Sequence, residues 1–63
     1  MRYVNRIKPL LYKLEKLWLK EPDLRFGQII CLLQNQMYTD DIFYIEEDEL
    51  EKAIDELIVK RYK

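Results

Sequence analysis

The side chains of this 63-residue chain that could do chemistry are few, and they do not combine into a catalytic set. There is no histidine, and Cys31 is the only cysteine. Without histidine, acid–base catalysis near neutral pH needs a carboxylate, lysine or tyrosine whose pKa is strongly shifted, and such shifts require burial that so short a chain seldom provides. The usual ligands of a structural zinc are missing as well. We therefore expect a protein that is not an enzyme and that uses no metal and no other cofactor.

Cys31 lies within five consecutive apolar residues, 29–33. In such a setting a thiol behaves as a small hydrophobic group, so we expect Cys31 to pack in the core or in an interface and not to react. A single free thiol is typical of a reducing compartment, and we expect the cytoplasm. No run of about 18 apolar residues is present to span a membrane, and the charged first residues are unlike a signal peptide.

Charge is unevenly distributed along the chain, although the net charge is only −1. Residues 1–38 hold seven basic and three acidic side chains, whereas residues 39–63 hold four basic and nine acidic ones. Five basic residues form a stripe on the first predicted helix: Arg2, Arg6, Lys13, Lys16 and Lys20. Either this stripe faces solvent and the acidic half of the chain, or it contacts the phosphates of a nucleic acid. Because no base-reading side chains accompany the stripe, nucleic-acid binding is the alternative interpretation.

The elements that must position these groups are helices. Apolar residues recur at helical spacing over residues 4–20, where one face combines Val4, Ile7, Leu10, Leu11, Leu14, Leu17 and Trp18. Pro9 predicts either that the regular helix starts near Lys8, with Pro9 in its first turn, or that the helix bends there. Glu21 and Pro22 then end it, because a residue before proline avoids helical angles.

Two further helices are predicted. The second begins after Asp23, a good N-cap, and extends to about residue 36, with Phe26, Ile29, Ile30, Leu33 and Met37 on its apolar face. The third covers about residues 49–62, with Leu50, Ala53, Ile54, Leu57 and Ile58 on one face. Asp48 and Glu51 have the spacing of a capping box. The acidic residues around them lack the alternating pattern and turn glycine of a calcium loop.

Between the second and third helices lies the segment "YTDDIFYIEED". Its β-forming and aromatic residues have nothing obvious to pair with, so we expect an extended connector that presses Phe43 and Tyr44 over the open end of the bundle. A short strand that pairs with a second copy is the alternative. The expected fold is therefore all-α: a small three-helix bundle with an extended aromatic connector, forming one domain over residues 1–63.

Apolar side chains remain that the three helices do not account for. Tyr12 and Leu19 are seven residues apart, lie away from the main apolar face, and suggest a protein–protein contact. Leu24, Cys31 and Leu32 give the second helix more apolar surface than two neighbouring helices can cover. On this surplus we expect a homodimer.

The segments "LWLKEPDLRFGQII" and "DIFYIEEDELEKAI" together resemble a family of short, uncharacterised bacterial and phage proteins. The shared pattern is a tryptophan helix, then Pro-Asp-Leu-Arg-Phe-Gly-Gln, then Asp-x-Phe-Tyr before Asp-Glu-Leu, and it covers about residues 7–57. The resemblance implies a common small helical fold. It carries no established activity and transfers no catalytic residue.

Two residues of this pattern are unusual in a helix. Arg25 is poorly placed for the dipole of the second helix, which predicts a carboxylate partner, namely Asp40, Asp41 or Glu47. Gly27 is costly in a helix, which predicts the close approach of another backbone or ring. Either these features brace the second helix against the connector, or Arg25, Gln28 and the connector form a recognition surface. The sequence thus favours a small protein-binding or regulatory module, of bacterial or phage type, over a nucleic-acid-binding protein.

Overall fold

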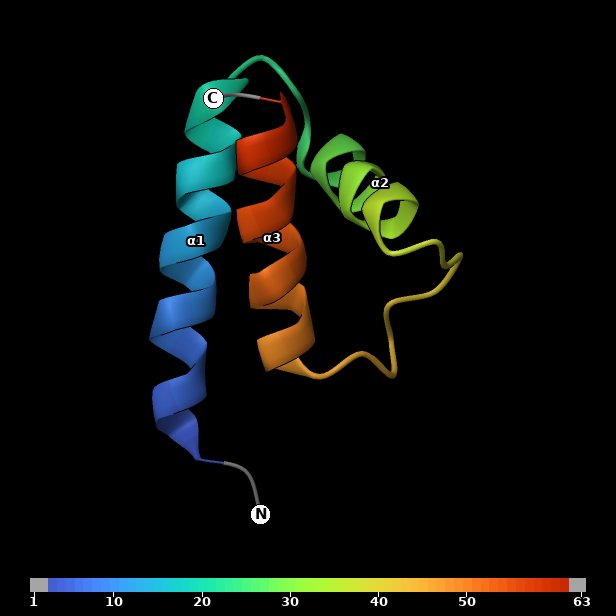
Figure 1. Ribbon diagram of the computed structural model, residues 1–63. Coiled ribbons are helices and arrows are strands. Elements are labelled where there is room, and N and C mark those ends of the chain that lie inside the picture. Colours follow the sequence, from blue (N-terminus) through green and yellow to red (C-terminus); the bar gives the residue numbers. More distant parts are fainter. Residues whose placement is uncertain (1–2, 62–63) are drawn as a thin grey trace.

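The computed structural model describes residues 3–61, which form three α-helices and no strand. A short 3-10 helix, η1 (Val4–Arg6), leads into α1 (Ile7–Lys20), and α2 (Phe26–Gln36) and α3 (Glu47–Arg61) follow (Figure 1). The predicted all-α, three-helix fold is confirmed. None of these helices is long and apolar enough to cross a membrane.

α1 and α3 lie side by side and run in the same direction (Figure 1). Ion pairs connect them in ascending order along both helices: Arg6 with Glu47, Lys13 with Glu51 and Asp55, and Glu21 with Arg61. Because exposed ion pairs contribute little to stability, their main effect is to favour this direction and register over others. The basic and acidic halves of the chain therefore attract each other within one molecule.

The core lies where the three helices meet. Its buried members are Leu17 from α1, Ile29 and Leu33 from α2, and Ala53, Ile54 and Leu57 from α3. The apolar face predicted for α3 is confirmed. Only part of the face predicted for α1 is buried, because Val4, Ile7 and Leu11 are 79%, 45% and 54% exposed. Phe26, expected in the core through α2, is half exposed.

The first helix begins and ends where its two prolines predict. Pro9 is the third residue of α1, within the first turn, whose backbone N–H groups have no partner inside the helix. The chain leaves the helix at Glu21, whose backbone N–H donates to the Trp18 carbonyl at 3.0 Å, and Pro22 follows. Of the two predicted arrangements, the one with Pro9 in the first turn is confirmed.

The start of α2 differs from the prediction. The N-cap is Arg25 and not Asp23, and the Arg25 backbone N–H donates to the Gln28 side-chain oxygen at 2.8 Å. Asp23 instead lies in a turn, in which the Leu24 backbone N–H donates to the Glu21 carbonyl. That turn uses the residues between Pro22 and Arg25, so the helix cannot begin earlier.

α2 ends in a tight hydrogen-bonded turn at Tyr38. The Thr39 backbone N–H donates to the Gln34 carbonyl, and the Tyr38 N–H donates to the Asn35 carbonyl. This is the Schellman arrangement, which requires a left-handed residue that is usually glycine. Here Tyr38 adopts it, with a φ of 55°.

The connector does not press its aromatics onto the bundle, so that prediction is wrong. Phe43 and Tyr44 are 79% and 83% exposed and occupy the middle of a turn in which the Ile45 N–H donates to the Ile42 carbonyl. Ile42 and Ile45 are the half-buried apolar residues of this segment. Within residues 3–61 the single chain forms no strand in this segment, and pairing with a second copy stays a prediction.

α3 begins two residues earlier than predicted, at Glu47. Asp48 is therefore inside the first turn, where its carboxylate accepts the Glu49 backbone N–H at 2.9 Å. The predicted Asp48–Glu51 capping box is wrong because Glu51 faces α1 and pairs with Lys13. Tyr62, the expected end of this helix, lies outside the described residues.

Candidate functional site

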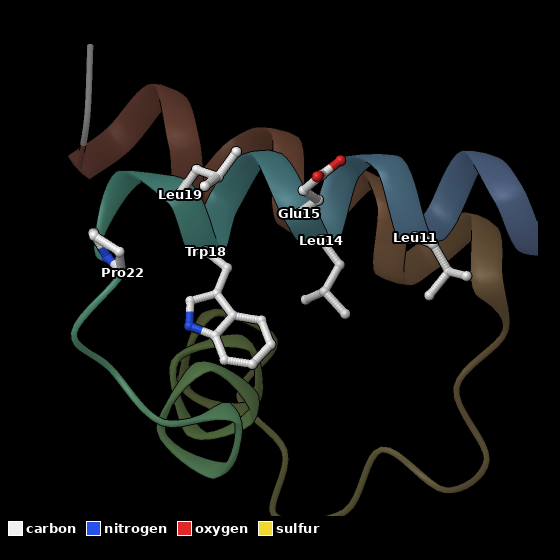
Figure 2. Close-up of a pocket in the computed structure, with 6 residues that line it drawn as sticks. All are labelled: Leu11, Leu14, Glu15, Trp18, Leu19 and Pro22. Atoms are coloured by element: carbon white, nitrogen blue, oxygen red, sulfur yellow. The ribbon is translucent and has the colours of Figure 1, made fainter.

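A groove with a largely apolar lining runs along α1 and has a volume of about 370 Å³. Its lining residues are Leu11, Leu14, Glu15, Trp18, Leu19 and Pro22. Figure 2 shows Leu11, Leu14 and Trp18 pointing to the side of α1 on which α2 lies, while Leu19 and Glu15 point away from α2. We call this feature the α1 groove.

The α1 groove exists because the apolar arc of α1 is wider than its neighbours can cover. α3 covers the flank of Leu17, which is fully buried. α2 is seen nearly end-on in both views while α1 lies in the plane, so α2 crosses α1 steeply and reaches only the end of α1 near Trp18 (Figures 1 and 2). Leu11 and Leu19 consequently remain 54% and 69% exposed.

One end of the groove is held rigidly by Trp18. Its indole N–H donates to the Leu24 carbonyl at 2.8 Å, which ties the end of α1 to the turn before α2. The indole also packs against Phe26, with ring centroids 5.7 Å apart and planes inclined by 33°. A preformed wall of this kind lowers the ordering cost of binding.

Basic residues border the groove on α1. Lys8 is three residues before Leu11 and Lys16 is three residues before Leu19, a spacing that makes each pair neighbours on the helix surface. The structure shows no ion pair for Lys8 or Lys16 within residues 3–61. The groove is therefore an apolar surface with positive charge at its edge, together with the single carboxylate of Glu15.

The predicted basic stripe is partly used inside the molecule. The Arg6 Nε donates to Glu47 at 2.9 Å, and Lys13 Nζ donates to Asp55 at 2.6 Å. The hydrogen bond to Asp55, together with the nearby Glu51, raises the pKa of Lys13 above its ordinary value of 10.5. Lys16 and Lys20 are exposed, and Arg2 lies outside the described residues. Nucleic-acid binding by this stripe stays a prediction, resting now on fewer charges.

The predicted Tyr12 and Leu19 surface is on the outside of α1, with the two side chains 65% and 69% exposed. Leu19 lines the groove, while Tyr12 lies beside it, one helical turn before Lys16. Seven residues were predicted to bind a partner: Tyr12, Leu19, Arg25, Gln28, Cys31, Phe43 and Tyr44. Of these, the structure places Leu19 in the α1 groove.

The predicted partners of Arg25 and the predicted role of Gly27 are wrong. Glu47 pairs with Arg6, and within residues 3–61 the structure shows no ion pair for Arg25. A Cβ atom added at Gly27 would meet no atom within 4 Å, so no close approach explains this glycine. The Gln28 side-chain oxygen accepts a hydrogen bond from the backbone N–H of Arg25, at the start of α2.

The apolar surplus on α2 is smaller than the sequence suggests. Leu24 and Leu32 are half-buried and pack against the core. Cys31 was predicted in the core or in an interface; its exposure rules out the core, and an interface stays a prediction. A homodimer stays a prediction, and the exposed apolar residues that favour it lie mainly on α1 and the connector.

Sequence reasoning missed Leu11, Leu14, Trp18 and Pro22 as residues that line a groove. The first three were assigned to the buried face of the first helix and Pro22 only to its end. The available signal was the width of the apolar arc, which at about 100° per residue runs from Leu17 to Leu11 and exceeds what one neighbouring helix covers.

No family model, curated protein or solved structure matches the chain. The resemblance to short bacterial and phage proteins therefore stays a prediction. Within residues 3–61 no group of three or more histidine, cysteine, aspartate or glutamate side chains is arranged to hold a metal ion.

Proposed function

We propose that this protein is a small non-enzymatic binding module that uses the α1 groove to bind an apolar segment of a protein partner. The observation that carries the proposal is the exposure of Leu11 and Leu19, both more than half accessible, beside a fixed tryptophan wall. Contiguous apolar surface with a charged rim is typical of protein interaction sites. The exposed thiol of Cys31 suits the reducing cytoplasm, where we expect the module to act.

A photocrosslinking amino acid placed at residue 19 tests the proposal. Leu19 lies on the groove, whereas Val59 on α3 is 64% exposed and lies outside it, which makes it a matched control. After irradiation of cells that produce the protein naturally, the label at residue 19 should give a discrete protein adduct and the label at residue 59 should not.

Leu11→Glu provides the second comparison. Leu11 is already half exposed, so a charge there should leave the helical far-UV circular dichroism spectrum unchanged while placing a carboxylate in the groove. We expect the residue-19 adduct to disappear in this variant. Equal adducts from residues 19 and 59, or an adduct that persists in a folded Leu11→Glu variant, would remove the groove from consideration as the binding site.

A further inference from the structure

The turn at the middle of the connector presents two aromatic rings to solvent. Phe43 and Tyr44 contact each other edge to face, with centroids 4.8 Å apart and an angle of 74° between the planes. The Phe43 backbone N–H donates to the Asp41 carboxylate at 2.8 Å, which fixes the turn. We call this pair the aromatic knob. Because the turn and the ring contact already hold both side chains, binding through them has a small ordering cost.

Acidic residues surround the aromatic knob. Between Arg25 and Lys52 the chain has no basic residue, and Asp40, Asp41 and Asp48 are all exposed. The border of the α1 groove is more basic, because Lys8 and Lys16 lie beside it and Glu15 is the one charged residue that lines it. An apolar projection among carboxylates and an apolar groove beside lysines are complementary in charge.

We infer that the aromatic knob of one copy docks in the α1 groove of a second copy, forming a symmetric dimer. This inference rests on the proposed function, because it names the partner of the same groove. The knob does not fill the groove of its own chain, since Phe43, Tyr44, Leu11 and Leu19 are all at least half exposed. In a twofold dimer each copy offers one knob and one groove, so the contact forms twice.

The interface is small but sufficient. Four aromatic rings that bury roughly 150 Å² each, against a similar area of groove, give about 1,200 Å², the lower limit of specific stable interfaces. We therefore expect a dimer that dissociates in the micromolar range and weakens with added salt, because its flanking charges are exposed.

Sedimentation equilibrium across micromolar concentrations tests the inference. The wild-type chain should change from monomer to dimer, and the double variant Phe43→Ser/Tyr44→Ser should dissociate at least 100-fold more readily. Both rings are exposed in the single chain, so this variant should keep the helical circular dichroism spectrum. A wild-type chain that stays monomeric, or a double variant that dimerises like wild type, overturns the inference.

A charge exchange identifies the contact itself. Lys16→Glu places a negative charge beside the groove, and Asp40→Lys places a positive charge beside the knob; each variant alone should dissociate about threefold more readily. Mixed together they should form a heterodimer with nearly the wild-type dissociation constant, because both contacts then pair opposite charges. No recovery in the mixture overturns the inference.

The mass of the residue-19 photoadduct separates this inference from the proposed function. An adduct of twice the chain mass supports self-docking. An adduct with a different protein, lost in Leu11→Glu, overturns self-docking while supporting the groove as a binding site. Absence of any adduct together with a monomeric wild type overturns both.

Discussion

Tyr38 is the one non-glycine residue within residues 3–61 with a positive φ, 55°, and its replacement by glycine should stabilise the protein. The residue ends α2 in a left-handed conformation, where a Cβ atom crowds the backbone carbonyl. Its ring is 92% exposed, so the side chain contributes almost no packing that glycine would lose. The backbone hydrogen bonds from Tyr38 and Thr39 would remain, because neither uses a side chain.

The size of the effect follows from two opposing terms. Relief of the left-handed strain contributes about 1–2 kcal/mol. The greater freedom of glycine in the unfolded chain removes about 0.5–1 kcal/mol of this. The net gain in the free energy of unfolding should be about 0.5–1 kcal/mol, which in a chain of this length raises Tm by roughly 2–8 °C.

Urea and thermal unfolding followed by circular dichroism measure this gain. The matched control is Tyr38→Ala, which also removes the ring but keeps the Cβ atom and hence the strain. We expect the alanine variant to unfold close to wild type and the glycine variant to unfold later. Should both variants be stabilised equally, the gain would come from removal of the ring, and the argument from backbone strain would be refuted.

Three further changes test other parts of the structure. Gly27→Ala should stabilise α2 by about 0.5 kcal/mol in urea unfolding, since the added methyl meets no atom within 4 Å, and destabilisation would contradict this. Leu17→Ala should cost about 3 kcal/mol, comparable to the whole stability of so short a chain, and abolish the helical spectrum, whereas the exposed Leu19→Ala should not. Because folding raises the pKa of Lys13 above 10.5, the stability advantage of wild type over Lys13→Met should be constant from about pH 7 up to that value and decline above it. A decline already between about pH 7 and 9 would refute the assignment.

The helices could be predicted from the sequence because their signals are local. Leu50, Ala53, Ile54 and Leu57 repeat at helical spacing, and the structure buries the last three in the core and leaves Leu50 half-buried. The helix starts were harder, because several neighbouring polar residues compete as caps. Asp23 is the better cap by type, but the turn after Pro22 uses it, and the helix begins after Arg25 instead.

The groove could not be predicted, because its exposure depends on how two helices cross. Periodicity correctly makes Leu11 and Trp18 part of one apolar arc, but it does not give the crossing angle of the helix that covers them. α2 has 11 residues, about 16 Å, and crosses α1 steeply, so it covers Trp18 and leaves Leu11 accessible. The prediction for the connector was wrong for a related reason. Ile42 and Ile45 are half-buried, and the turn between them directs Phe43 and Tyr44 into solvent.

The parallel pairing of α1 with α3 also determines the order in which the chain can fold. Its ion pairs join residues 38 to 42 positions apart, so each closes a loop that contains all of α2. Contacts so distant along the chain are slow to form compared with those of a helical hairpin. During synthesis, Leu17 is therefore not enclosed before Ile54 and Leu57 have been made, and until then the first helix leaves the flank that α3 covers open to solvent and to chaperones.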